Sequence, residues 1–151
     1  MTSSWKQTMV SLLFLVASAT ASGRGAVWLT DFGQAKKLAA QRDVPILVDF
    51  TGSDWCGWCM KLDEEVFSQR TFRQYAAKNL VLFKADFPRQ KKQDKALRER
   101  NKQLASKYGV RGFPTVFLLR ADGTVIARTG YQPGGAGAYV EHLKELQAGT
   151  L

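Results

Sequence analysis

The sequence predicts a single α/β domain with a mixed central sheet and helices on both of its faces. Short apolar runs that suit buried strands alternate with amphipathic segments that suit helices, an order that favours parallel strand pairing. An Asp-Gly pair joins two of the runs as a hairpin, which adds one antiparallel edge. The chain of 151 residues is long enough to bury a core without disulfide staples, and 45% of it is apolar.

Strands and helices are predicted from the two periodicities. The strands are apolar runs bounded by Pro, Gly or Asp, at 46–50, 80–86, 115–119 and 124–127. The helices have apolar residues at three- and four-residue spacing, at about 31–42, at 56–76 with a break at Ser68, over about 15 residues within 89–107, and at about 138–147. The resulting order is α-β-α-β-α-β-β-α.

The boundaries of these elements have chemical reasons. Thr30 or Asp31 can cap the first helix, and Pro45 prevents it from continuing into the first strand. Pro88 ends the second strand, and Asp122-Gly123 supplies the positive φ angles of a hairpin turn. The last two helices are expected to turn inward the side chains of Leu97, Leu104, Tyr108, Tyr139, Val140, Leu143 and Leu146.

The first 21 residues form a secretory signal pattern rather than part of the fold. Lys6 gives a positive start, residues 9–17 are apolar, and Ala19 and Ala21 are the small residues that a signal peptidase reads. The apolar run is shorter than the ~20 residues of a transmembrane helix, although an uncleaved membrane anchor is the alternative. We expect cleavage near Ala21, a domain over 22–151, and a periplasmic or secreted location.

The net charge of +9 is concentrated in one segment. From Arg89 to Lys107 there are eight Lys and Arg residues and two acidic residues. Such a segment can contact nucleic acid or anionic lipid. It carries no aromatic residue for base stacking, however, and export removes most nucleic-acid partners. We therefore expect a solvated helix face and no nucleic-acid partner.

Both cysteines of the chain lie in one CxxC, where a strand is predicted to lead into a helix. A bridge between Cys56 and Cys59 closes a very small loop and stabilises a fold little, so chemistry explains the pair better. Cys56 lies at the helix N-terminus, where unpaired N–H groups and the helix dipole favour a thiolate and lower its pKa. Cys59, one turn later, can attack a mixed disulfide and release the product.

A metal site or an organic cofactor is not expected. Structural zinc normally takes four nitrogen or sulfur ligands, and the chain offers two cysteines and one distant histidine, His142. Two further uses of the cysteines stay open: an inert structural bridge, and Cu(I) held by both thiolates near Met60. Thiol–disulfide exchange itself needs no cofactor.

Three segments together resemble thioredoxin: 46–50 (ILVDF), 55–61 (WCGWCMK) and 108–115 (YGVRGFPT). Their order and spacing match thioredoxin over nearly the whole mature chain. Residues 52–59 (GSDWCGWC) with 61–67 (KLDEEVF) are similar to exported bacterial thioredoxin-like proteins, a group related to the C-terminal domain of the transmembrane disulfide reductase DsbD. The resemblance implies a thioredoxin-like fold and a thiol–disulfide oxidoreductase.

The resemblance also implies roles for residues outside the CxxC. Asp49 looks like the buried carboxylate that moves the proton of Cys59, and Lys84 matches its lysine partner. A structural ion pair between Asp49 and Lys84 is the alternative, because a carboxylate inside a strand is costly without a partner. Desolvation is expected to raise the pKa of Asp49 toward neutrality.

The substrate is expected to lie over aromatic residues beside the cysteines. Pro114 looks like the cis-proline that faces the cysteine pair in this fold, and the backbone of Phe113 would pair with the substrate chain. Trp55 resembles the tryptophan that covers the active-site surface, although it could simply serve packing. Exposed apolar surface at Trp58 would extend this binding patch.

Two departures from thioredoxin itself affect the expected potential and approach. The stretch between Phe50 and Trp55 is one residue longer, and Gly-Trp replaces Gly-Pro between the cysteines. No histidine or other cation lies inside the pair to stabilise the thiolate strongly. This absence favours a reductase or isomerase over a strong oxidant.

The sequence therefore predicts a monomeric protein-disulfide reductase or isomerase. Its partners would be disulfide-containing exported proteins and a membrane or soluble thiol reductant that recharges the dithiol. A second hypothesis is a thioredoxin-fold binding module that holds clients or a soft metal without turnover. A third is a surface binder that uses the basic segment.

Overall fold

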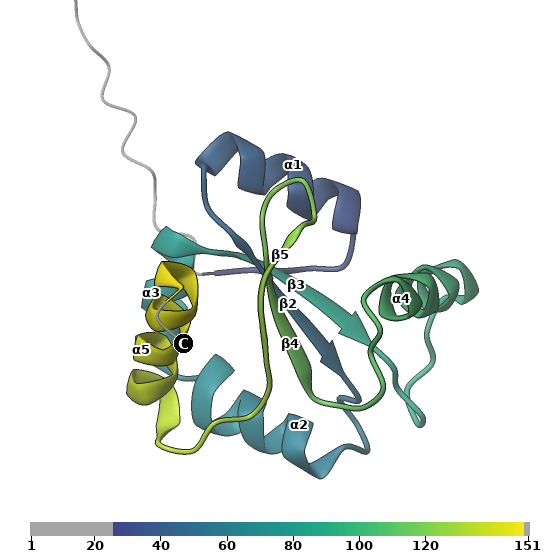
Figure 1. Cartoon of the computed structure of the whole chain (residues 1–151). Helices are drawn as coiled ribbons and strands as arrows, with labels where there is room; N and C mark the ends of the chain where they lie inside the picture. Colours follow the sequence, from purple (N-terminus) through teal and green to yellow (C-terminus); the bar gives the residue numbers. More distant parts are fainter. Residues whose placement is uncertain (1–25, 150–151) are drawn as a thin grey trace, which may run out of the picture.

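The computed structural model describes residues 26–149, which fold around one five-stranded sheet (Figure 1). The expected signal segment, 1–21, lies outside the described residues. The strands are β1 (Trp28–Leu29), β2 (Ile46–Thr51), β3 (Val81–Asp86), β4 (Thr115–Leu119) and β5 (Val125–Thr129). The helices are α1 (Phe32–Arg42), α2 (Gly57–Leu62), the π-helical turn η1 (Asp63–Phe67), α3 (Arg70–Asn79), α4 (Lys95–Lys107) and α5 (Gly135–Ala148). Within 26–149, no helix combines the length and apolarity that a membrane span requires.

The sheet is mixed, as predicted, with strand order β1-β3-β2-β4-β5. β3 pairs in parallel with β1 and β2, whereas β4 pairs antiparallel with β2 and β5. Antiparallel pairing thus reaches the centre of the sheet, and the prediction that confined it to one edge was wrong. A helix between two strands makes them parallel only when it carries the chain back across the sheet, and α4 does not.

The connection through α4 gathers three loops at one edge of the sheet. Thr51 at the end of β2 pairs with Asp86 at the end of β3, and Thr115 at the start of β4 pairs with Phe50. The segments 52–56, 87–94 and 109–114 therefore leave or enter the sheet at the same edge. In open α/β sheets this is the edge where ligands bind.

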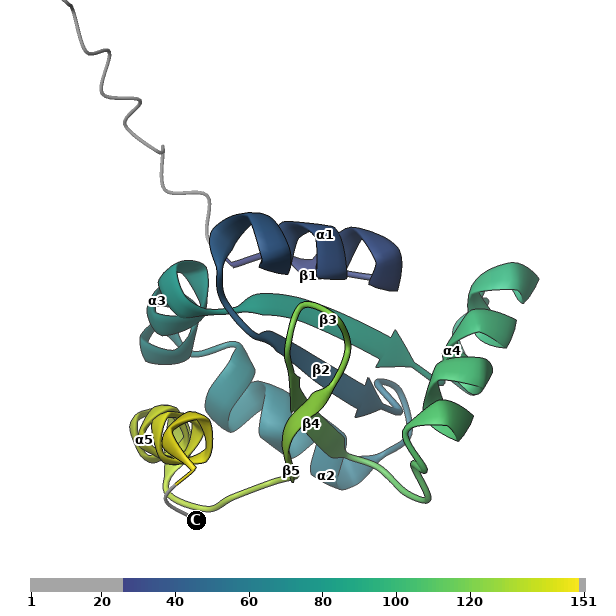
Figure 2. The same ribbon diagram turned by 45° about the horizontal axis from the view of Figure 1, so that its top comes forward.

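Helices lie on both sides of the sheet (Figure 2). An apolar cluster packs against each of its two faces. Ile46, Val48 and Phe50 of β2 pack with α1 and with the inner side of α4. Leu47 packs in the cluster that includes residues of α2, η1, α3 and α5. Because side chains alternate along a strand, Asp49 faces the same side as Leu47, toward α2 and α5.

Several local predictions are confirmed. The Asp31 side chain caps α1 by accepting the N–H of Gln34 at 2.8 Å. The helical segment after the cysteines ends at Ser68, and α3 follows. Gly123 has the positive φ, 94°, that the hairpin between β4 and β5 requires.

Some boundaries differ from the prediction. The helix of the basic segment, expected to have about 15 residues, has 13 and begins at Lys95, because the Asp94 side chain accepts the N–H of Leu97 at 2.9 Å and fixes the cap there. The buried residue of α4 is Asn101, whose Nδ2 donates to the carbonyl of Asp86 at 3.0 Å. α5 begins at Gly135 rather than near 138, and β5 runs to Thr129. β1 was missed because two residues are too few to show an alternation.

Candidate active site

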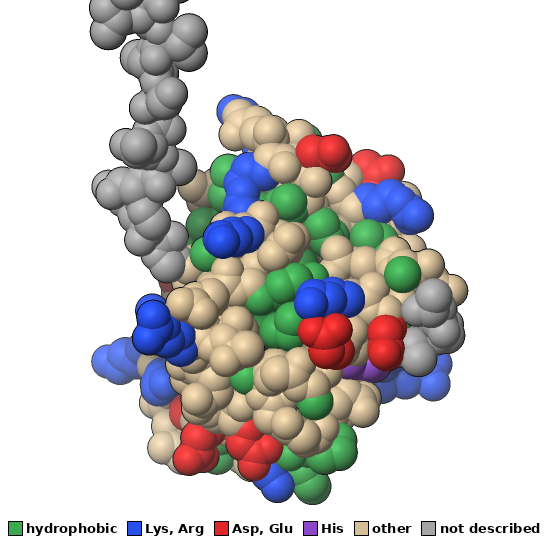
Figure 3. Space-filling view, turned by 90° about the vertical axis from the view of Figure 1, so that its left-hand side faces the viewer, with side chains coloured by type: hydrophobic (Ala, Val, Ile, Leu, Met, Phe, Trp, Pro, Cys, Tyr) green, Lys and Arg blue, Asp and Glu red, His purple; other side chains and the backbone are tan. Residues whose placement is uncertain are grey.

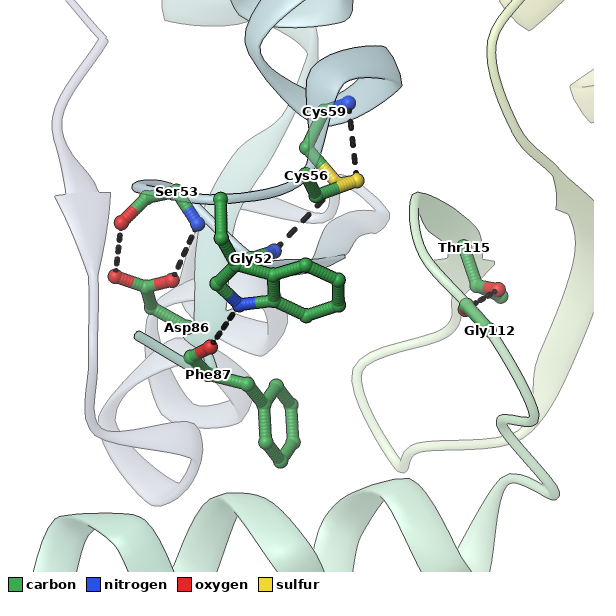
Figure 4. Close-up of a disulfide and its surroundings, with 9 residues drawn as sticks. Gly52, Ser53, Cys56, Cys59, Asp86, Phe87, Gly112 and Thr115 are labelled. Carbon is green, nitrogen blue, oxygen red and sulfur yellow. Dashed lines mark hydrogen bonds between the residues drawn. A yellow bond between two sulfur atoms is a disulfide. The ribbon is translucent and has the colours of Figure 1, made fainter. Parts of the chain in front are cut away.

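The two cysteines form a disulfide at the start of α2, with their Cα atoms 5.2 Å apart (Figure 4). Cys56 is the N-cap residue of α2, and its Sγ accepts the N–H of Cys59 at 3.3 Å. The Sγ of Cys59 accepts the N–H of Gly52 at 3.5 Å. Cys56 is 8% exposed and Cys59 is 4% exposed. An N–H group aimed at a sulfur favours its thiolate form, so Cys56 has the surroundings of an attacking group.

Trp55 is held from three directions. Its Nε1 donates to the carbonyl of Phe87 at 2.7 Å, and its ring lies 6.0 Å from that of Phe113. A Cβ built on Gly52 would lie 2.5 Å from Cε2 of Trp55, so only glycine allows this approach. Phe87 and Phe113 stack at 4.9 Å. Trp55 thus joins the CxxC loop to the two other loops at this edge.

The turn expected to face the cysteines has the predicted backbone form. The Phe113–Pro114 peptide is cis. The Thr115 side chain closes the turn by donating from Oγ1 to the carbonyl of Gly112 at 2.7 Å. Figure 4 shows Gly112 and Thr115, where the loop enters β4, across from the disulfide. The contact between Phe113 and Trp55 brings this turn to the site.

Trp58, between the cysteines, lies on the surface and is 58% exposed. Its ring lies 5.1 Å from that of Tyr131, and the Nζ of Lys61 lies 5.2 Å from the Trp58 ring centroid. Tyr131 donates its hydroxyl hydrogen to Glu65 at 2.6 Å, and this bond raises the pKa of Tyr131. Lys61 also pairs with Glu65 at 3.8 Å. The charges on this side of the disulfide are therefore balanced.

Asp49 lies buried on β2, three residues before Gly52. Its Oδ1 has no hydrogen-bond partner among the residues of 26–149. Burial raises the pKa of Asp49 to about 7, and the positive charge of Lys84 limits the rise. The carboxyl group therefore exchanges a proton near neutral pH.

Lys84 lies opposite Asp49 in the sheet register, but it makes its ion pair elsewhere. Its Nζ is 3.8 Å from Oδ1 of Asp63 and 4.8 Å from the centroid of the Trp28 ring. No direct ion pair between Lys84 and Asp49 occurs within the described part of the chain. The expected alternative, a satisfied structural pair, was wrong because Asp63 on η1 takes the lysine.

Asp54 and the loop that it holds were not anticipated. The Asp54 carboxylate accepts the backbone N–H groups of Arg89, Gln90 and Lys91 at 2.8–2.9 Å, and these bonds lower its pKa. The Arg89 guanidinium lies 3.6 Å from the centroid of the Trp55 ring. The extra residue before Trp55 was the one signal, because a longer loop gives an acidic side chain room to reach a neighbouring segment.

A second anchor holds the same loop. Ser53 donates its N–H and its hydroxyl hydrogen to the Asp86 carboxylate, at 3.0 and 2.6 Å. Figure 4 shows this pair beside Gly52 and the disulfide. The two anchors fix the CxxC loop against the end of β3.

No group of three or more His, Cys, Asp or Glu side chains suited to a metal occurs within 26–149. His142, the single histidine of the chain, is half-buried, and its Nε2 lies 2.8 Å from Oγ1 of Thr129. This contact joins α5 to β5.

The sequence matches the family model of the thioredoxin-like domain over residues 32–144. The chain belongs to the thioredoxin-like family. It is 36% identical to the disulfide bond reductase DsbH of Chlamydia pneumoniae over 113 residues, which are 75% of this chain and 68% of DsbH. The thioredoxin-related protein DsbJ of the same organism is 30% identical over 121 residues, which are 80% of this chain and 35% of DsbJ.

Solved structures agree with this assignment. A DsbH oxidoreductase superposes with a TM-score of 0.78 at 30% identity and covers 98% of this chain and 95% of its own. The oxidised C-terminal domain of Neisseria meningitidis DsbD, at 22% identity, superposes with a TM-score of 0.51 over 74% of this chain and 89% of its own, and supports the fold alone. The predicted fold class and the predicted class of activity, a thiol–disulfide oxidoreductase, are confirmed.

Proposed function

We propose that this protein reduces disulfide bonds of exported proteins through the dithiol of Cys56 and Cys59. The observation that carries the proposal is the position of the pair. Cys56 caps α2 with a sulfur that accepts the Cys59 N–H at 3.3 Å, and Cys59 is the less exposed of the two. The relative DsbH, 36% identical to this chain, is named a disulfide bond reductase.

The reaction is complete with one dithiol and one substrate disulfide. The Cys56 thiolate attacks a substrate sulfur, the substrate S–S bond breaks, and the released thiolate takes a proton. Cys59 then loses its proton and attacks Cys56, so that the mixed disulfide breaks and the second substrate thiol leaves. Two electrons pass to the substrate, and the Cys56–Cys59 disulfide is the oxidised enzyme.

Asp49 is the proposed acceptor of the Cys59 proton. It is buried on the face of the sheet that α2 covers, and its Oδ1 is free of hydrogen-bond partners among the described residues. A pKa of about 7 lets it take and return a proton at neutral pH. Lys84 acts through charge, because it keeps this pKa from rising further.

Trp55, Trp58, Phe113 and Pro114 form the proposed substrate surface. Trp55, next to Cys56 in the sequence, contacts Phe113. Trp58, between the two cysteines, offers an exposed ring. A substrate chain along the Phe113–Pro114 turn would present its disulfide to Cys56 between the two tryptophans.

The proposed site of action is the periplasm or the extracellular space. It rests on the signal pattern of residues 1–21, and N-terminal sequencing of the exported protein tests cleavage near Ala21. The partners proposed with it are disulfide-containing exported proteins and a membrane or soluble thiol that recharges the dithiol. The protein acts as a monomer and binds no nucleic acid.

Cysteine substitution tests the proposal. Cys56→Ser abolishes reduction of insulin disulfides, whereas Cys59→Ser leaves the attack intact and traps substrate as a mixed disulfide visible on a non-reducing gel. Cys56→Ser should trap nothing, which makes it the control for the trapping variant. Retained function in Cys56→Ser would contradict the proposal and favour a binding module without turnover.

A further inference from the structure

The loop between β3 and α4 places positive charge at the rim of the site. Arg89, Lys91 and Lys92 on this loop are exposed, and so is Arg111 on the loop that leads to Phe113. The two loops touch where Phe87 stacks on Phe113 at 4.9 Å. These four residues are called the cationic lip.

The cationic lip adjoins the substrate surface and is held in place. The Arg89 guanidinium lies 3.6 Å from the centroid of the Trp55 ring. The Asp54 carboxylate accepts the N–H groups of residues 89–91, which fixes their backbone. A lip fixed by backbone bonds presents its side chains to a ligand at a lower entropic cost than a free loop would.

The carboxylates near the cationic lip already accept hydrogen bonds from other groups. Asp54 accepts three backbone N–H groups, Asp86 accepts two bonds from Ser53, and Asp94 caps α4. None of the ion pairs found within 26–149 includes a residue of the cationic lip. These three carboxylates still carry negative charge and offset part of the lip, but its four positive side chains outnumber them.

The Trp58 side lacks this excess, because Lys61 is paired with Glu65. On the side that carries α3 and α5, several Lys and Arg side chains lie next to Asp and Glu side chains (Figure 3). The exposed face of α4 carries a positive excess of its own, with five basic residues and one acidic residue. The cationic lip is the part of this basic region that adjoins Trp55.

We propose that the preferred substrates are disulfides flanked by acidic residues, which dock on the cationic lip while Cys56 attacks. This inference rests on the proposed function and names its substrate class. Opposite charge raises the local concentration of a ligand and its association rate, by about 10-fold or more at low salt. An acidic peptide fits better than nucleic acid, because the lip adjoins the turn that would pair with a peptide chain and α4 carries no aromatic residue for base stacking.

The test uses three disulfide-bonded peptides that differ only in the residues flanking the cysteine: aspartate, asparagine or lysine. We expect kcat/KM to be about tenfold higher for the aspartate peptide than for the lysine peptide at low ionic strength. The ratio should fall toward one in about 0.5 M salt, where screening is nearly complete at the distances involved.

Charge reversal assigns the effect to the lip. In the double variant Lys91→Glu/Lys92→Glu, kcat/KM should become higher for the lysine peptide than for the aspartate peptide. Since the ratio is taken within one variant, any inactive fraction cancels. The control variant Lys37→Glu/Lys78→Glu lowers the net charge by the same amount, but its changes lie on the exposed surfaces of α1 and α3. It should keep the wild-type ratio of kcat/KM values.

The outcomes separate the two proposals. Equal kcat/KM values for the three peptides in the wild type would overturn the cationic lip but leave the reductase intact. No reduction of the asparagine peptide would overturn the proposed function and this inference with it. A third outcome would favour another ligand. If the protein binds single-stranded DNA or phosphatidylglycerol vesicles, and Lys91→Glu/Lys92→Glu abolishes that binding but leaves the ratio of peptide kcat/KM values unchanged, the inference is overturned in favour of that ligand.

Discussion

The two sides of the Cys56–Cys59 disulfide are built differently. On the Trp55 side the indole donates to Phe87 at 2.7 Å, packs on Gly52 and lies under Arg89. On the Trp58 side the ring is 58% exposed and contacts Tyr131. The nearby charges of Lys61 and Glu65 balance one another. One side is anchored and cationic, and the other is open and neutral.

Because of this difference, the two parts of a bound substrate would contact unlike surfaces. A disulfide that approaches Cys56 meets a fixed surface with uncompensated charge on one side and an adaptable apolar surface on the other. Fixed hydrogen bonds position a substrate backbone, whereas an exposed ring contributes contact area that tolerates varied side chains. We therefore attribute positioning to the Trp55 side and tolerance of different clients to the Trp58 side.

The largest effect is expected from Asp49, because it serves the reaction from whichever side a substrate approaches. Asp49→Asn should slow release from the mixed disulfide by about 100-fold, the scale of a lost general base. In the wild type the release rate should rise with pH through about 7, as Asp49 ionises. The variant should lose this rise. Stopped-flow measurement of release from about pH 5 to 9 checks both, and an unchanged profile would contradict the role of Asp49.

Asp49 should also set the pH dependence of stability. Burial raises its folded pKa from 3.8 to about 7, so the folded state holds the proton more tightly than the unfolded state. Its contribution to stability is therefore full below about pH 4 and is lost as pH rises to about 7. From about pH 4 to pH 8 the wild type should lose on the order of 4 kcal/mol relative to Asp49→Asn. Urea unfolding of both proteins at the two pH values checks this, and parallel pH dependences would count against it.

Gly52→Ala should break the Trp55 side. The added Cβ would lie 2.5 Å from the indole, so Trp55 must move and weaken its bond to Phe87. We expect a loss of about 2 kcal/mol in the free energy of unfolding. Gly137→Ala is the matched control, because a Cβ there meets nothing within 4 Å and alanine favours the helix. Equal stability of Gly52→Ala and wild type would show that the anchored side is not rigid.

Asp54→Asn should loosen the cationic lip without unfolding the protein. An amide oxygen is a weaker acceptor than a carboxylate for the three N–H groups of residues 89–91. Hydrogen exchange at these amides should therefore become faster. Exchange elsewhere, for example in β2, serves as the internal reference. Unchanged exchange at 89–91 would mean that the loop is held by other contacts.

Trp58→Ala should have the smallest effect on stability, within about 0.5 kcal/mol, because the ring is largely exposed. Its effect should instead be on KM, which rises for bulky apolar substrates and changes little for short polar peptides. Thermal unfolding and steady-state kinetics on both substrate types check this. A strong loss of stability would place Trp58 with the anchored side.

The sequence predicted the features of the site that depend on local pattern. The CxxC at a strand-to-helix junction follows from a short motif, and the cis peptide at Phe113–Pro114 and the buried Asp49 follow from the resemblance of short segments to thioredoxin. The order of helices and strands followed from periodicity, apart from β1. These features are written in neighbouring residues, so a single sequence shows them.

The features that were missed depend on contacts between distant segments. Asp54 meets residues 89–91, and Tyr131 meets Glu65 of η1, only because the fold brings these distant segments together. Lys84 pairs with Asp63 of η1 rather than with Asp49, which a strand register cannot reveal. The antiparallel pairing of β4 with β2 was missed for the same reason, since a linear order of elements does not say where α4 leads the chain.

The reduction potential of the Cys56–Cys59 pair, measured by equilibration with glutathione, tests the central claim most directly. A reductase needs a pair that gives electrons to substrate disulfides, so the potential should lie between the values of glutaredoxin and thioredoxin, about −200 to −270 mV. A value above about −150 mV, toward that of strong oxidants, would contradict the reductase.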